Sequence, residues 1–115
     1  MVRIAIPIFH ARVSPILDNC TRLLILDLDH GREIKRQKIS LENFSVIERF
    51  NLIKKMNIDV IICCAVSEEM DHMIQGTGIQ LICGIVGDVN KVLDAYIGNH
   101  LDDAAFHMPG YYETE

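Results

Sequence analysis

The sequence predicts a single α/β domain built on a mixed five-stranded sheet. Short aliphatic runs of strand length recur along the chain, and three segments carry apolar residues at helical spacing. The length of 115 residues suits one domain, and 50% of the residues are hydrophobic. The formal charge of -5 leaves no basic excess to neutralise phosphates, so nucleic acid is not an expected partner.

The first half of the chain predicts three strands. A β-rich run from Val2 to Phe9 precedes a loop over residues 10–21, and loops of that length in compact domains are usually functional. The aliphatic run Leu23–Leu28 is typical of a strand buried on both faces. Residues 29–32 predict a tight hairpin turn, and Glu33–Ile39 has the Lys-rich and Arg-rich composition of a protected edge strand.

The second half predicts helices that alternate with strands. Each helix begins at a residue whose side chain can accept a backbone N–H bond: Ser45, Ser67 and Asp88. Short strands are expected at Ile58–Cys63 and Ile79–Cys83. Right-handed crossovers then give the strand order 3-2-1-4-5, with strand 2 antiparallel. Residues 1–98 would form the domain, and residues 99–115 a polar C-terminal tail.

This arrangement predicts a crevice where the carboxyl ends of strands 1, 4 and 5 share one edge, because open α/β sheets bind ligands there. The loop 10–21 and residues 63–67 and 83–88 meet at that edge. Two helix N-termini there favour an anionic ligand. Gly87 allows a close approach of the backbone.

The four cysteines are all expected near this crevice, with Cys83 at the end of the last strand. Cys63 and Cys64 end one strand, and Cys20 lies in the loop. Adjacent strand residues point to opposite faces, so Cys63 and Cys64 do not both enter one pocket while the strand stays regular. The alternative for each thiol is a small apolar filler, which we expect for Cys83. No spacing matches C-x2-C, so a structural zinc site is not expected.

The sequence favours a binding protein over an enzyme. The first strand carries no acidic residue, which removes the paired carboxylates that a metal-dependent nuclease would need. No serine stands in a nucleophile elbow. No apolar stretch approaches the ~20 residues that span a bilayer, and the N-terminus lacks signal-peptide features. Four cysteines in such a chain are expected to be reduced thiols, and together these features predict a cytoplasmic protein.

Six short motifs, in order along the chain, resemble the dinitrogenase iron–molybdenum cofactor biosynthesis family. They are IAIP at 4–7, RVSPILD at 12–18, RLLILD at 22–27, IIC-x-AVS at 61–67, GDV at 87–89, and LDD with FHMPG at 101–110. The resemblance implies a ribonuclease H-like three-layer fold. It also implies binding or carrying of an anionic metal–sulfur cluster, such as an iron–molybdenum cofactor or a precursor. Relatives include a protein that holds a molybdenum–copper sulfide cluster.

Two positions depart from the family pattern. Cys64 stands where the family turn usually has Gly, and Tyr111 follows Met-Pro-Gly where a subgroup often carries Cys. Because position 111 is Tyr, the C-terminal tail offers no thiol ligand there, and we expect the loop 10–21 and backbone N–H groups to bind the cluster instead.

The predicted carboxyl edge of the sheet and the family resemblance together predict which residues bind the cluster. The expected cluster-binding residues are His10, Arg12, Ser14, Asp18, Cys20, Cys64, Ala65, Ser67 and Gly87, with Cys20 and Cys63 as metal ligands. The expected partners are cluster donor or acceptor proteins, without nucleic acid or membrane. The alternative is a regulatory or protein-interaction domain of the same fold that has lost the cluster.

Overall fold

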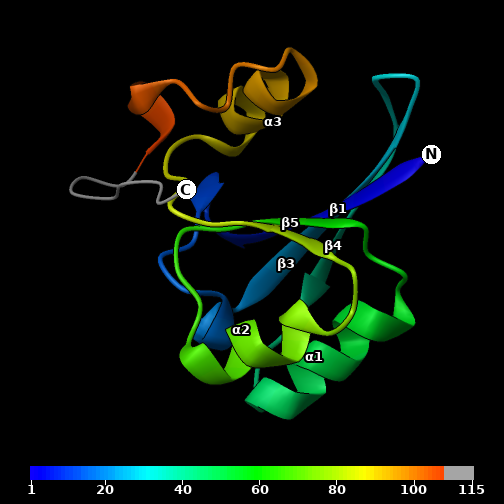
Figure 1. Cartoon of the computed structure of the whole chain (residues 1–115), viewed down its shortest axis with the longest axis vertical. Coiled ribbons are helices and arrows are strands. Elements are labelled where there is room, and N and C mark those ends of the chain that lie inside the picture. The colour runs from blue at the N-terminus through cyan, green and yellow to red at the C-terminus, as the bar shows by residue number, and fades with distance from the viewer. Residues whose placement is uncertain (108–115) are drawn as a thin grey trace.

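A computed structural model describes residues 1–107 and has the mixed α/β architecture that the sequence predicts. Three α-helices cover the two faces of a twisted sheet, with α3 on one face and α1 and α2 on the other (Figure 1). Residues 108–110 and Tyr111, which entered the family resemblance, lie outside the described residues.

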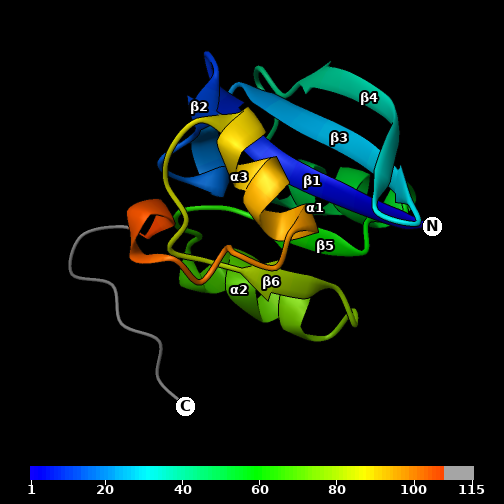
Figure 2. The same cartoon turned by 90° about the horizontal axis from the view of Figure 1, so that it is seen from above.

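Five of the strands in residues 1–107 follow the order β4-β3-β1-β5-β6 (Figure 2). β1 is antiparallel to β3 and parallel to β5, and β6 is parallel to β5. The strands are β1 (Val2–Phe9), β2 (Arg12–Val13), β3 (Arg22–Asp29), β4 (Arg32–Ser40), β5 (Val60–Ile62) and β6 (Gln80–Ile82). Within residues 1–107 the sheet therefore has six strands, and the expected number of five was wrong, because β2 pairs with the end of β1.

The β3–β4 hairpin forms because its two turn residues adopt a left-handed backbone. His30 has φ 50° and Gly31 has φ 76°, between the paired residues Asp29 and Arg32. Positive φ at both central positions matches the right-handed twist of the flanking strands. β4 is the exposed edge that its charged composition predicts.

The three helices begin at the predicted capping residues. They are α1 (Val46–Lys55), α2 (Glu68–Gln75) and α3 (Val89–Ile97). Ser45 and Glu48 form a reciprocal capping box, while Ser67 and Asp88 each accept a bond from a first-turn N–H. Among residues 1–107, no helix has the length and apolar character needed to cross a bilayer.

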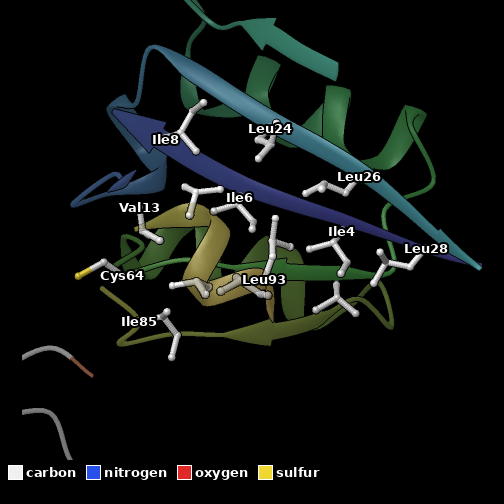
Figure 3. Close-up of a cluster of buried hydrophobic side chains, with 14 residues drawn as sticks. Ile4, Ile6, Ile8, Val13, Leu24, Leu26, Leu28, Cys64, Ile85 and Leu93 are labelled. Atoms are coloured by element: carbon white, nitrogen blue, oxygen red, sulfur yellow. The ribbon is translucent and has the colours of Figure 1, made fainter. Parts of the chain in front are cut away.

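The sheet separates two hydrophobic clusters. Side chains alternate along β3, so that Leu24 and Leu26 face α3 whereas Leu23 and Ile25 face α1 and α2. Figure 3 shows the cluster on the α3 side, including Cys64. The strands β1, β3 and β5 contribute side chains to both clusters, so they form the centre of the core.

Part of the predicted polar tail packs on the domain. The short 3₁₀ turn η2 (Ala104–Phe106) follows α3, and the Phe106 carbonyl accepts a hydrogen bond from the Val86 N–H at 2.7 Å. Leu101 and Phe106 pack against the α3-side cluster. Residues 99–107 therefore cover one side of the loop that leads into α3, while a domain boundary at residue 98 stays a prediction.

A half-buried ion pair joins the two neighbouring strands β1 and β3. Arg3 donates from Nε to Asp27 Oδ1 at 2.7 Å, and also donates from Nη1 to the Met56 carbonyl at 2.7 Å. Arg3 and Asp27 face each other in the β1–β3 register. The hydrogen bond from Arg3 holds the pKa of Asp27 below its ordinary value.

This ion pair predicts a pH-dependent stability. A carboxyl whose folded pKa is lowered stabilises the protein above its unfolded pKa of about 3.9, and that stability is lost as the pH falls through the folded value. We expect Asp27→Asn to lower the urea midpoint at pH 7, with a smaller deficit at pH 3. Asp29→Asn, an exposed carboxyl on the same strand, is the control. An equal deficit at both pH values would contradict the prediction.

Candidate functional site

The loop 10–21 lies across the carboxyl ends of the parallel strands. It begins at His10, whose backbone has a left-handed φ of 56° and whose exposed ring packs against Phe9 with centroids 4.3 Å apart. Arg12 follows in β2, is exposed, and forms an isolated bridge with Asp88. The loop therefore turns back over the sheet directly after β1.

Backbone hydrogen bonds tie the first part of this loop to the turn before α3. The Val13 N–H donates to the Gly87 carbonyl at 3.0 Å, and the Val89 N–H donates to the Ala11 carbonyl at 2.9 Å. Gly87 has φ 118°, and open space surrounds the position that a Cβ would take. The predicted residues Arg12 and Gly87 thus belong to one bonded unit.

The second part of the loop is tied to the turn after β5. The Leu17 N–H donates to the Ala65 carbonyl at 3.0 Å, and Ile16 forms a parallel bridge with Ala65. Ser14 is buried, and its N–H donates to the Pro7 carbonyl at 2.8 Å. The loop therefore links β1, β5 and the turn before α3 through its own backbone.

Asp18 occupies the N-terminus of α2. Its carboxylate accepts the Ser67 N–H at 2.8 Å and the Ser67 hydroxyl through its second oxygen. The same hydroxyl accepts the Met70 N–H at 3.1 Å, as a helix cap does. The helix dipole favours an anion at this end, and here the chain supplies its own carboxylate.

A buried arginine in α1 holds the other side of the loop. Arg49 is 5% exposed, and its guanidinium donates to the carbonyls of Leu17, Cys20, Leu41 and Phe44. Sequence analysis missed this residue. Its signal was present, because residue 49 lies on the apolar stripe formed by residues 46, 50 and 53. A charged residue on such a stripe needs buried partners.

The cysteines divide between the two faces of the sheet. Cys64 lies in the α3-side cluster, whereas Cys20 and Cys63 lie in the cluster with α1 and α2, so the predicted separation of Cys63 from Cys64 is confirmed. Cys63 and Cys83 place their sulfurs 3.8 Å apart. The expectation that Cys83 is only a filler missed this pair, which the matching strand ends at 63 and 83 could have indicated.

The surroundings of the thiols set their acidity. Burial raises the pKa of Cys20 and of Cys64. The hydrogen bond between the Cys63 and Cys83 sulfurs raises the pKa of Cys63 and lowers that of Cys83. Cys20 also accepts a bond from Arg49 at 3.5 Å. In this conformation the predicted ligands Cys20 and Cys63 are therefore buried thiols whose pKa lies above the ordinary value.

The structure sorts the predicted site residues by exposure. His10 and Arg12 are exposed; Asp18, Ala65, Ser67 and Gly87 are half-buried; Ser14, Cys20, Cys63 and Cys64 are buried. Among residues 1–107, no group of three or more His, Cys, Asp or Glu side chains is arranged to hold a metal ion. The roles of these residues in binding stay predictions.

Open pockets lie beside this edge. One of about 490 Å³ runs along β6 and is lined by residues that include Gln80, Cys83 and His107. Two smaller pockets, of about 300 Å³ and 90 Å³, include His10. His10 is thus the predicted residue that borders open space next to the loop.

Comparisons with solved structures show that this fold is shared. The crystal structure of PH0822 matches with a TM-score of 0.80 and 18% identity over 85% of this chain and 90% of its own. A candidate dinitrogenase from Methanocaldococcus jannaschii matches at 0.70 and 21%, over 90% and 95%. The apo form of the orange protein from Desulfovibrio gigas matches at 0.72 and 15%, over 93% and 96%. No family model matches the chain, and no curated protein matches it.

Arg49 provides a direct test of how the loop is held. Arg49→Met keeps the length of the side chain but leaves several buried carbonyls without their donor, so we expect a loss of roughly 3 kcal/mol in the free energy of unfolding. Urea denaturation measures this loss. Arg36→Met, on the exposed strand β4, is the control and should change stability far less. Equal losses for the two variants would contradict the bracing role.

Proposed function

We propose that this chain binds an anionic metal–sulfur cluster as cargo at the carboxyl edge of β1, β5 and β6. The observation that carries this proposal is a rim at that edge, formed by the loop 10–21 and the turns at Ala65 and Gly87. The loop 10–21 is hydrogen-bonded to both following turns, at Ala65 and at Gly87. The rim thereby joins segments that are far apart in the sequence. The shared fold with the orange protein and the candidate dinitrogenase supports the same class of role.

The proposal extends to the family and its fold. We propose membership of the dinitrogenase iron–molybdenum cofactor biosynthesis family, with a ribonuclease H-like fold. The order β4-β3-β1-β5-β6, with β3 antiparallel to β1, supports this assignment. The protein would act as a cytoplasmic carrier rather than an enzyme, and would exchange its cargo with cluster donor or acceptor proteins.

Charge and backbone are better placed than thiols to hold such a cargo. Arg12 and His10 are exposed on the rim, and Gly87 leaves open space beside the backbone. Cys20 and Cys63 are buried, so thiolate ligation by either would require the loop to move. We therefore propose that the cluster is held mainly by the Arg12 and His10 side chains and by backbone N–H groups, with ligation by Cys20 and Cys63 as the alternative.

A second candidate is a regulatory or protein-interaction domain without a cluster. This candidate is favoured because groups at the edge already form hydrogen bonds within the chain. Asp18 already fills the N-terminus of α2, and Val89 donates its N–H to Ala11, so part of the predicted anion site is satisfied within the chain. Such hydrogen bonds within the chain are the stable state expected of a domain that has lost its cargo.

Anaerobic reconstitution separates the two candidates. The full chain is treated with iron, molybdate or thiomolybdate, and sulfide, then desalted and measured by elemental analysis and visible absorption. We expect retained metal and colour. Between about 0.1 M and 1 M salt the Debye length falls from about 10 Å to 3 Å, so most of the cluster should be released at the higher salt. A colourless, metal-free protein would favour the interaction domain.

Matched variants test how the cluster is held. Arg12→Gln should lower metal retention several-fold, whereas Arg32→Gln, an exposed arginine in the β3–β4 hairpin, should not. Cys20→Ser and Cys63→Ser should retain the cluster. Salt-resistant binding that is lost in either serine variant would instead assign the cluster to the thiolates.

A further inference from the structure

Cys63 and Cys83 stand side by side at the ends of two neighbouring parallel strands. β5 and β6 pair Ile62 with Ile82, and the next residue on each strand is a cysteine. Their sulfurs are 3.8 Å apart. Disulfides need Cα atoms about 4.4–6.8 Å apart, and neighbouring strands lie about 4.8 Å apart. The backbone spacing is therefore compatible with a bond between these residues.

The local backbone also leaves room for the sulfurs to approach. Both cysteines lie one residue beyond the paired strands. The Cys63 N–H remains bonded to the Ile82 carbonyl at 2.9 Å, which keeps the two strand ends together. Gly84, directly after Cys83, has φ 80° and begins a turn. Side-chain rotation at two strand ends is thus the main movement that bonding requires.

We propose that Cys63 and Cys83 form a reversible intramolecular disulfide, a modification site that links the ends of β5 and β6. The site does not depend on the proposed cargo. Cys83 is half-buried and lines the pocket of about 490 Å³ beside β6, whereas Cys63 is fully buried. Because Cys83 is more exposed than Cys63, a small oxidant reaches Cys83 first.

The co-reactant is a low-molecular-weight disulfide. The Cys83 sulfur, after losing its proton, attacks one sulfur of this disulfide and releases the other half as a thiolate. The Cys63 sulfur then loses its proton, attacks Cys83 in the mixed disulfide and releases the second half. The two protein thiols are oxidised by two electrons. The small disulfide is reduced to two thiol molecules, which take up the two protons.

The other two thiols have surroundings that differ from those of this pair. Cys64 belongs to the hydrophobic cluster on the opposite face of the sheet. Cys20 lies on the same face as Cys63, but its sulfur accepts a bond from Arg49 at 3.5 Å. These contacts predict one specific pairing among the four cysteines.

Mass spectrometry of the oxidised wild-type chain tests the pairing. The folded protein is incubated with oxidised glutathione, alkylated and digested. Trypsin leaves residues 56–91 as one peptide, because no Lys or Arg lies between its ends, so a second cleavage after Glu68 or Glu69 is needed to separate Cys83 from Cys63 and Cys64. We expect the two fragments to stay linked, with two fewer thiols alkylated per chain, and dithiothreitol to reverse the change.

Cysteine variants decide which residues form the link. Cys64→Ala and Cys20→Ala should keep it, whereas Cys63→Ala and Cys83→Ala should lose it, with circular dichroism confirming that each variant is folded. Alkylation of all four thiols in the oxidised wild-type chain would overturn the proposal. A link that disappears in Cys64→Ala or in Cys20→Ala would overturn it as well.

Discussion

The guanidinium of Arg49 is the interaction on which the carboxyl edge of this sheet depends. It is buried in α1 and donates to carbonyls of the loop 10–21 and of the segment before α1. A buried cation with these partners fixes the loop, because any other arrangement would leave both the charge and the carbonyls without hydrogen bonds. The hydrogen bond from the Ser67 N–H to the Asp18 carboxylate then ties the same loop to the N-terminus of α2. One residue of a helix thus holds a loop that follows a strand.

The way in which the loop 10–21 is held limits how the carboxyl edge of the sheet can bind a ligand. The backbone of the loop is bonded to the turns at Ala65 and Gly87, so the segment that would receive a ligand is ordered by the fold itself. Arg12 and His10 remain exposed on it. A cargo held by charge needs such a fixed rim, whereas a cargo held by Cys20 or Cys63 needs the rim to open. The proposed function and its alternative therefore differ in the movement that each demands of the same loop.

The sequence predicted the elements whose causes are local. The capping residues of the three helices, the turn at His30 and Gly31 and the doubly buried strand β3 all follow from neighbouring residues. It did not predict β2, which pairs back on the end of β1, because a strand of two residues is too short to show a periodic pattern. Arg49 was missed although it lies on the apolar stripe of α1. The matching strand ends hinted at the pairing of Cys63 with Cys83, and the β5–β6 register then places the two residues side by side.

Amide hydrogen exchange tests the central claim that the loop 10–21 is a braced part of the fold. The informative amides are those of Val13, Leu17 and Val89, which make the bonds between the loop and the turns. We expect them to exchange on the timescale of global unfolding, as the central strands do, and to lose this protection in Arg49→Met. Rapid exchange of these three amides in the wild-type protein, at the rate of an unprotected loop, would contradict the account.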